Sequence, residues 1–131
     1  MIIIDSSVWI DLLRGTQTPQ TDWVKEALKH QSVSLTDLIL CEVLQGIRDD
    51  RLYAEIREIF LEYEILPMGG IGLALASAEN YRKLQKKGFT IRKTIDCLIA
   101  TFCILNSHSL LHSDRDFDAF EKELDLQVIH P

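Results

Sequence analysis

Short apolar runs alternate with amphipathic segments along the 131 residues of the chain. Short apolar runs bounded by polar residues predict buried strands, and apolar residues repeated every three or four positions predict one face of a helix. The predicted strands are 1–4, 33–35, 65–67, 109–111 and 127–129, and the predicted helices are 8–13, 23–28, 37–43, 52–63, 71–85, 95–102 and 116–124. Strands that alternate with helices favour right-handed crossovers and an α/β fold, with a parallel sheet covered by helices on both faces.

Length and composition are those of one globular domain over residues 1–131. Hydrophobic residues make up 47% of the chain and charged residues 26%, which excludes the disordered, collagenous and disulfide-rich classes. The three cysteines are odd in number and show no C-x-x-C spacing, so we expect reduced thiols in a cytoplasmic protein. No apolar run approaches the ~20 residues that span a bilayer, so we expect no membrane association.

Two aspartates follow predicted strands. Asp5 comes directly after the first strand, and Asp114 comes closely after the strand at 109–111. The carboxyl ends of parallel strands form one edge of a sheet, where ligands bind, so these two carboxylates are expected to meet there. Each residue also precedes a predicted helix, so helix capping explains either one equally well.

Two further acids lie on predicted helices. Glu42 shares a face with Leu38 and Ile39, and a carboxylate on a buried face is costly unless it is paired or bound to a cation. A Glu42 at the border of that face, either snorkelling to solvent or salt-bridged, is the alternative. Asp96 lies in the first turn of its helix, where the helix dipole favours it, yet apolar residues share its side. Asp116 adds a fifth acid.

Carboxylates gathered at one edge cannot all remain ionised and unpaired. Either their pKa values rise or divalent cations neutralise them. Such oxygen ligands suit Mg²⁺ or Mn²⁺, and the chemistry that these ions support best is hydrolysis of a phosphodiester. Ser6 and Ser7 follow Asp5 and are candidates to hold a water or a phosphate oxygen there, or to cap the helix that follows.

Four segments carry a family resemblance. They are Ile-Asp-Ser-Ser-Val-Trp-Ile at 4–10, Glu42 followed by Gly46, Asp-Cys-Leu-Ile-Ala at 96–100, and Leu-Leu-His-Ser-Asp-Arg-Asp-Phe at 110–117. In this order and spacing they resemble the PIN-domain ribonucleases, and among these they are most similar to the VapC toxins of prokaryotic toxin–antitoxin pairs. The resemblance covers the whole chain and implies a PIN-like three-layer α/β/α sandwich with a central parallel sheet of four to five strands.

The resemblance also implies an endoribonuclease that depends on Mg²⁺ or Mn²⁺. Its catalytic acids are expected to be Asp5, Glu42, Asp96 and Asp114, which are also metal ligands together with Asp116. It further implies a homodimer and a VapB-type antitoxin, which blocks the active-site groove and carries the complex to operator DNA. Relatives often have Thr where this chain has His112, so the supporting role of the neighbouring Ser113 hydroxyl stays open. Three interpretations of His112 itself stay open: a structural residue, a general acid or a metal ligand.

Charge is distributed unevenly along the chain. The net charge is −6, which by itself argues against a nucleic-acid-binding surface. Residues 82–93 nevertheless contain six basic residues and no acid: Arg82, Lys83, Lys86, Lys87, Arg92 and Lys93. Cations near a helix C-terminus account for part of this set, but we predict that it contacts RNA phosphates. The apolar face of the helix at 52–63 is either core or a docking surface.

Two other classes compete with a nuclease. One is a catalytically inactive PIN-like module that binds RNA or protein, against which the full set of acids argues. The other is a phosphate-handling α/β protein, either an aspartate-nucleophile phosphatase or a phospho-accepting receiver. The former needs an acid at position 7 and the latter needs paired acids after the first strand, where this chain has Ser7 and Ser6.

Overall fold

The computed structural model describes residues 1–30 and 33–131. Across these residues five strands form one sheet in the order β3-β2-β1-β4-β5, and every neighbouring pair is parallel. The strands are β1 (Ile2–Ile4), β2 (Ser34–Thr36), β3 (Glu64–Leu66), β4 (Ser109–Leu111) and β5 (Gln127–Val128). The predicted parallel sheet is therefore confirmed, with β1 at its centre.

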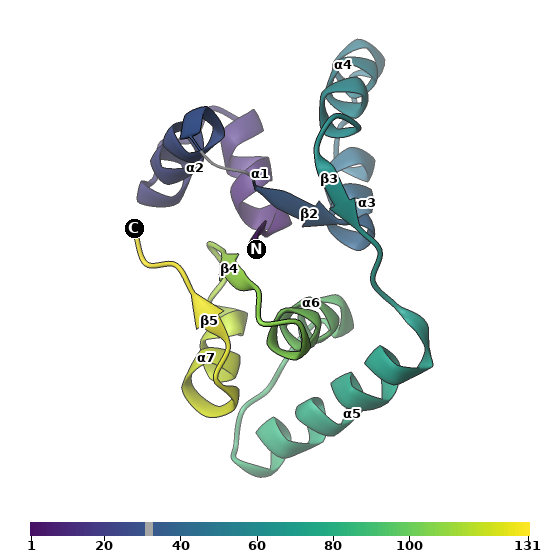
Figure 1. Ribbon diagram of the computed structural model, residues 1–131, viewed down its shortest axis with the longest axis vertical. Coiled ribbons are helices and arrows are strands. Elements are labelled where there is room, and N and C mark those ends of the chain that lie inside the picture. Colours follow the sequence, from purple (N-terminus) through teal and green to yellow (C-terminus); the bar gives the residue numbers. More distant parts are fainter. Residues whose placement is uncertain (31–32) are drawn as a thin grey trace.

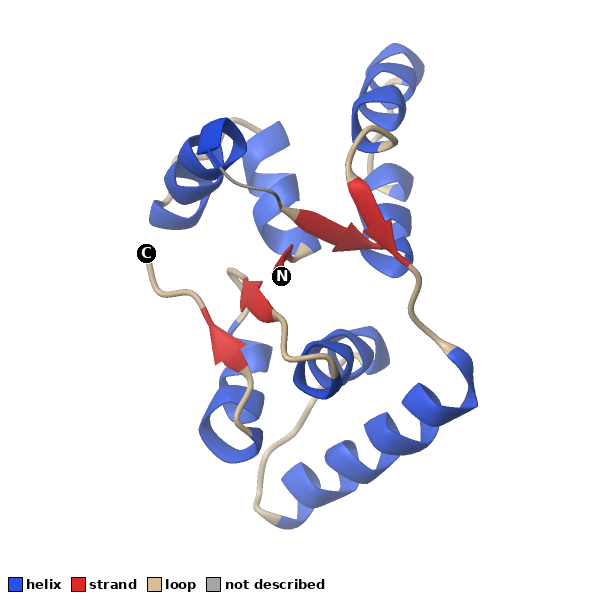
Figure 2. Ribbon diagram, in the orientation of Figure 1, coloured by secondary structure: helices blue, strands red, loops and turns tan. Residues whose placement is uncertain are grey.

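Helices cover both faces of the sheet. They are α1 (Ser6–Leu13), α2 (Pro19–His30), α3 (Asp37–Gln45), α4 (Asp50–Phe60), α5 (Gly70–Lys86), α6 (Thr94–Leu105), the 3₁₀ helix η1 (Arg115–Phe117) and α7 (Asp118–Leu124). Figure 1 shows α1 and α2 on one side of the strands and α5 and α6 on the other. Figure 2 shows the strands as the middle layer between helices. This arrangement confirms the predicted three-layer α/β/α sandwich.

The central strands have apolar side chains that are buried on both faces. Ile3, Ile4, Leu110 and Leu111 are all fully buried. Their register is Ile3 opposite Leu110 and Ile4 opposite Leu111, so β1 and β4 end level with each other. The residues that follow these two strands therefore leave the sheet at the same edge, which is where the candidate site forms.

Helix α4 differs from the prediction. The helix ends at Phe60, with Leu61 as its C-cap, and Tyr63 lies in the turn before β3 because the chain must reverse there to start a strand at Glu64. Phe60 packs edge-on against Trp9 of α1, with ring centroids 5.0 Å apart. The apolar face is thus partly core, whereas other members of it are exposed, namely Leu52 and Ile59.

Other boundaries differ at helix starts. The first helix begins at Ser6 rather than at position 8, because Asp5 accepts a hydrogen bond from the Ser7 amide and caps it. Helix α2 begins at Pro19, since Thr18 and Thr21 exchange hydrogen bonds between side-chain oxygen and amide (2.9 and 3.0 Å) at its start. The predicted helix at 116–124 is divided into η1 and α7. Within the described ranges, no helix combines the length and apolar character needed to cross a membrane.

Candidate active site

Asp5 stands at the carboxyl end of the central strand β1. Its Oδ2 accepts hydrogen bonds from the Ser7 amide at 3.0 Å and from the Ser7 hydroxyl at 2.6 Å. The Ser7 hydroxyl in turn accepts from the Ser113 amide at 3.0 Å, in the loop after β4. Asp5 is buried, and its Oδ1 has no hydrogen-bond partner among the described residues. Ser7 thus holds Oδ2 of this carboxylate, whereas Oδ1 has no partner among the described residues.

Glu42 reaches the same edge from α3. The Ser6 hydroxyl donates a hydrogen bond to its Oε1 at 3.1 Å, so the two serines after Asp5 hold two different acids. Glu42 is half-buried. Burial and the Asp5 carboxylate raise its pKa, while Ser6 and Lys93 act in the opposite direction. The buried-face prediction and its salt-bridge alternative both miss this hydroxyl, which lies 36 residues away in the sequence.

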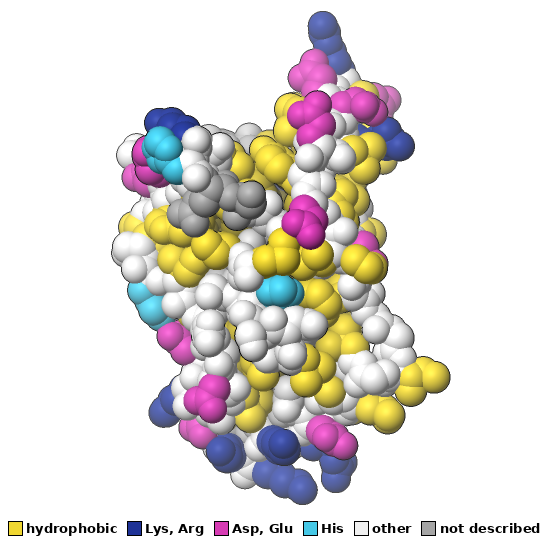
Figure 3. Space-filling view, in the orientation of Figure 1, with side chains coloured by type: hydrophobic (Ala, Val, Ile, Leu, Met, Phe, Trp, Pro, Cys, Tyr) yellow, Lys and Arg dark blue, Asp and Glu magenta, His cyan; other side chains and the backbone are white. Residues whose placement is uncertain are grey.

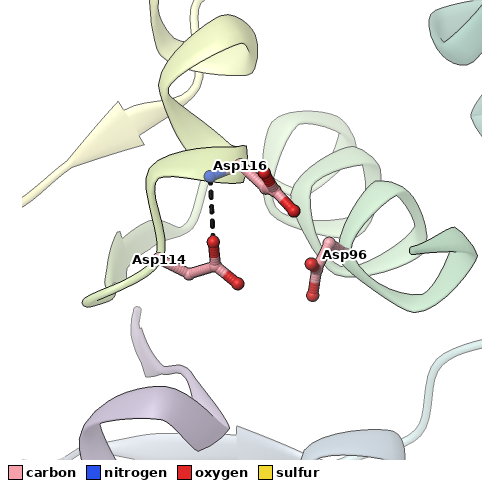
Figure 4. Close-up of side chains that lie close together, drawn as sticks. All are labelled: Asp96, Asp114 and Asp116. Carbon is pink, nitrogen blue, oxygen red and sulfur yellow. Dashed lines mark hydrogen bonds between the residues drawn. The ribbon is translucent and has the colours of Figure 1, made fainter. Parts of the chain in front are cut away.

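Three aspartates converge beside these two acids. One carboxylate oxygen from each of Asp96, Asp114 and Asp116 lies within 4.8 Å of the others. Figure 4 shows Asp96 approaching from α6, opposite Asp114 and Asp116 on the loop and η1. Asp114 Oδ1 accepts a hydrogen bond from the Asp116 amide at 2.9 Å and so caps η1, as the capping alternative predicts. Capping and clustering are therefore compatible.

Electrostatic repulsion within the site is strong. Burial, followed by the charges of Asp5 and Asp114, raises the pKa of Asp96 to about 7. Burial likewise raises the pKa of Asp5. Lys93 lowers the pKa values of both Asp96 and Glu42, which places its positive charge near the acids. The acids therefore share more negative charge than the surrounding protein neutralises.

The donor set fits a small divalent cation. Asp5 Oδ1 and Asp96 Oδ2 are buried carboxylate oxygens without a hydrogen-bond partner among the described residues, and such atoms are costly to leave unpaired. Oxygen ligands from several carboxylates are what Mg²⁺ and Mn²⁺ prefer. A bound cation would satisfy these oxygens and offset the repulsion among the acids.

The exposed side chain of Arg92 is paired with this cluster. Its Nε and Nη2 donate to the two carboxylate oxygens of Asp116, both at 3.2 Å. The residues are 24 positions apart, so the sequence carries no signal for the pairing. Lys87, another member of the predicted RNA-binding set, forms an ion pair with Glu123 at 3.0 Å. Figure 3 shows Lys and Arg side chains gathered over the C-terminal end of α5.

The loop after β4 is organised by its backbone. His112 Nδ1 accepts a hydrogen bond from the Asp114 amide at 3.2 Å, and its ring packs against Phe117 with centroids 4.9 Å apart. Burial lowers the pKa of His112, which favours the neutral ring that such acceptance requires. Ser113 contributes its amide to Ser7. These contacts fit a structural role for His112, but its Nε2 is buried without a hydrogen-bond partner among the described residues, so the structural, general-acid and metal-ligand interpretations all stay predictions.

The PIN domain family model matches residues 2–123. This chain belongs to the PIN domain family. Ribonuclease VapC11 of Mycobacterium tuberculosis is 29% identical to it over 130 residues, which cover 98% of this chain and 97% of that protein. Two solved structures share the fold, VapBC2 from Rickettsia felis bound to a promoter DNA fragment and FitAcB from Neisseria gonorrhoeae. The former aligns with a TM-score of 0.76 at 18% identity, over 98% of both chains. The latter aligns with a TM-score of 0.76 at 21% identity, over 100% of this chain and 98% of that one.

Membership of the family confirms the resemblance inferred from the four sequence segments. In this PIN domain the five predicted acids come from five separate places in the chain: the end of β1, α3, α6, the β4–η1 loop and η1. Asp96, Asp114 and Asp116 form the tightest group, while Asp5 and Glu42 flank it and act on it through their charges. Their individual roles remain predictions.

Proposed function

We propose that this PIN domain, over residues 1–131, is a cytoplasmic endoribonuclease and the toxin of a VapC-type toxin–antitoxin pair. The observation that carries the proposal is the convergence of carboxylates from distant segments, with buried oxygens of Asp5 and Asp96 left without partners among the described residues. The name of the mycobacterial relative, a ribonuclease, supports the same activity. A merely structural arrangement of acids has no reason to keep so much unpaired charge together.

The cation site comprises Asp5, Glu42, Asp96, Asp114 and Asp116, and Mg²⁺ or Mn²⁺ is its proposed occupant. When bound, such a cation lowers the pKa of an attacking water and offsets negative charge on the phosphate. Ser7 orients Asp5 through the 2.6 Å hydrogen bond, and Ser6 orients Glu42. The two serines thus hold these acids in place before substrate binds. Such preorganisation contributes to the rate because the acids need not be reoriented during the reaction.

The phosphate-binding surface is proposed to run from the C-terminal end of α5 to the acids. Lys83 and Lys86 lie in the last turn of α5, and Lys93 is the N-cap of α6, three residues before Asp96. Cations in this order lead a polyanion towards the site. Arg82, Lys87 and Arg92 complete the set, the last two from within ion pairs.

A VapB-type antitoxin is the proposed protein partner. A groove of about 410 Å³ lies between α1, α3 and the start of α4, and its apolar lining comes from Ile10, Leu13, Val43, Ile47 and Leu52. Arg14, Arg48 and Asp49 also line the groove, so it offers both apolar and charged contacts to a segment of a partner. The structural likeness to a VapBC complex on promoter DNA supports such a partner, and we include a homodimer and an operator-bound complex in the proposal.

The test compares wild type with Asp96→Asn and the control Asp50→Asn, an exposed acid in the first turn of α4. Each protein is first expressed in a bacterial host, where growth is followed. The purified proteins are then incubated with total RNA and with a panel of structured RNAs, with and without Mg²⁺. We expect growth arrest and Mg²⁺-dependent cleavage by wild type and Asp50→Asn, and neither by Asp96→Asn. Equal cleavage by all three proteins contradicts the proposed site. RNA binding without cleavage by wild type instead favours the inactive binding module.

A further inference from the structure

We propose that Arg92 is a resident counter-ion of the cation site, which exchanges between Asp116 and the phosphate of bound RNA. In this arrangement a cation and RNA bind cooperatively, because each favours the same position of the Arg92 side chain. The inference rests on the proposed function, since it assumes that the acids hold a divalent cation. The exchange of Arg92 couples the binding of the cation to the binding of RNA. Neither the acids nor the basic residues at 82–93 provide this coupling by themselves.

The geometry of the ion pair is the first observation. The Arg92 guanidinium donates through two nitrogens to both carboxylate oxygens of Asp116, each at 3.2 Å. The side chain of Asp116 is only 9% exposed, and its carboxylate belongs to the group of three within 4.8 Å. A cation that uses Asp116 must therefore share these oxygens with a guanidinium or displace it.

The freedom of the Arg92 head group is the second observation. Its side chain is 63% exposed, although it is paired with a nearly buried partner. Its backbone lies between the end of α5 and the start of α6 and is held on one side by the buried Ile91. The chain thus fixes where the side chain starts and leaves its end free to rotate. Water can solvate the exposed guanidinium once it leaves Asp116, whereas the nearly buried Asp116 carboxylate then needs the cation as its partner.

Electrostatic forces act on the Arg92 side chain both towards the acids and towards bound RNA. Without a cation, Asp5, Glu42, Asp96, Asp114 and Asp116 repel one another, and Arg92 is held at the cluster by Asp116 first and by Asp114 and Asp96 more weakly. A bound dication repels the guanidinium through the same space. An RNA phosphate attracts it outwards and matches its two-pronged geometry as a carboxylate does. Coupling between two ligands is reciprocal, so RNA must tighten cation binding as much as the cation tightens RNA binding.

A positioning role for Arg92 predicts the opposite sign. If the guanidinium mainly holds Asp116 in a ligating orientation, its removal loosens Asp116 and weakens cation binding. If it is a counter-ion, its removal leaves Asp116 free and strengthens cation binding. The sign of the change in affinity therefore separates the two roles without any measurement of catalysis.

The first experiment measures Mn²⁺ affinity by calorimetry for wild type, Arg92→Gln and Lys25→Gln. Lys25→Gln makes the same change in net charge at an exposed position of α2, outside the proposed sites. We expect Arg92→Gln to bind Mn²⁺ about fivefold more tightly or better, and Lys25→Gln to match wild type within about twofold. An unchanged or weaker affinity of Arg92→Gln overturns the proposal.

The second experiment tests the coupling. Mn²⁺ titrations are repeated with a phosphorothioate oligoribonucleotide, whose integrity is checked on a gel afterwards. The oligonucleotide is expected to tighten Mn²⁺ binding by wild type and to have a smaller effect on Arg92→Gln, in which the exchanging group is missing. An equal effect on both proteins overturns the coupling.

Asp96→Asn separates this proposal from the proposed function. If wild type binds no Mn²⁺, or if Asp96→Asn binds it as tightly as wild type, the cation site itself is wrong and both proposals fail. If Asp96→Asn loses binding while Arg92→Gln remains like wild type, the site stands and only the counter-ion role of Arg92 fails.

Discussion

The Ser7 hydroxyl joins Asp5 to the loop that carries Asp114. It donates to Asp5 Oδ2 at 2.6 Å and accepts from the Ser113 amide at 3.0 Å, across 106 positions of sequence. Both of its hydrogen-bonding roles are used, so the end of β1 and the end of β4 are connected through one side chain. The relative placement of two acids thus depends on a residue that carries no charge.

Replacing Ser7 with Ala is expected to lower the free energy of unfolding by about 1–2 kcal/mol, since it removes both hydrogen bonds at a partly buried position. Mn²⁺ affinity is expected to fall as well, because Asp5 loses the group that orients it. Urea unfolding and calorimetry measure the two effects. Ser113→Ala is the matched control, since it retains the amide that donates to Ser7. Equal losses in the two variants would falsify the assignment of the link to the Ser7 hydroxyl.

The pKa of Asp96 predicts a dependence of stability on pH in the absence of metal. Its ordinary value of 3.8 is raised to about 7 in the folded chain, first by burial and then by Asp5 and Asp114. The folded state therefore retains a proton that the unfolded state releases, and stability from this source is present below pH 3.8 and lost as pH rises towards 7. One unit of pKa shift corresponds to about 1.4 kcal/mol.

Asp96→Asn cannot ionise, so its stability relative to wild type should increase from about pH 4 to about pH 7 and level off above that range. Thermal unfolding in EDTA at several pH values gives this difference and cancels the titration of groups that do not interact with Asp96, among them His112. Asp50→Asn should show no such trend, because Asp50 lies exposed in the first turn of α4. A difference between wild type and Asp96→Asn that is flat with pH contradicts the raised pKa.

The sheet and the gathering of the acids were predictable from sequence because they follow from periodicity and strand ends. Ile2–Ile4 is an apolar run that ends at an acid, and parallel strands bring such ends to one edge. The pairs Ser6–Glu42 and Arg92–Asp116 were not predictable, since they depend on how distant elements are placed in space. Local pattern therefore identifies the acids but not the side chains that orient or neutralise them.

The predicted end of the helix at 52–63 was wrong because core packing and helix periodicity produce the same spacing of apolar residues. The helical spacing of apolar residues continues to Tyr63, but the helix ends at Phe60 because β3 must begin at Glu64. Tyr63 still packs against Trp9, with ring centroids 6.0 Å apart, so its apolar character reflects the core rather than the helix. A spacing rule cannot distinguish these two causes.

The contact between Phe60 and Trp9 predicts how α4 is held. Phe60 is 3% exposed, and its ring meets Trp9 edge-on, so Phe60→Ala should lower the free energy of unfolding by about 3–5 kcal/mol. Its neighbour Ile59 is 47% exposed, and Ile59→Ala should cost under about 1 kcal/mol. Urea unfolding followed by tryptophan fluorescence measures both. Comparable losses would mean that the outer face of α4 is also packed in solution, for example in a dimer.

The basic end of α5 predicts how RNA binding responds to salt. Net charge is −6, so RNA binding must depend on local cations, and Lys83 and Lys86 lie in the last turn of α5, outside the ion pairs that engage Lys87 and Arg92. Substituting both lysines with Ala should weaken binding of single-stranded RNA. The slope of log affinity against log salt should become shallower by about 1.4, since each phosphate contact to a single strand contributes roughly 0.7.

Filter binding at several salt concentrations measures this slope, in EDTA so that RNA is not cleaved. The control pair Lys25→Ala and Lys29→Ala removes the same charge from α2, on the opposite side of the sheet from α5 (Figure 1). If the control pair flattens the slope as much as the α5 pair does, the effect reflects net charge and not a phosphate-contacting surface. A slope that changes only for the α5 pair assigns the path of the RNA to the side of the fold from which Lys93 and Arg92 reach the acids.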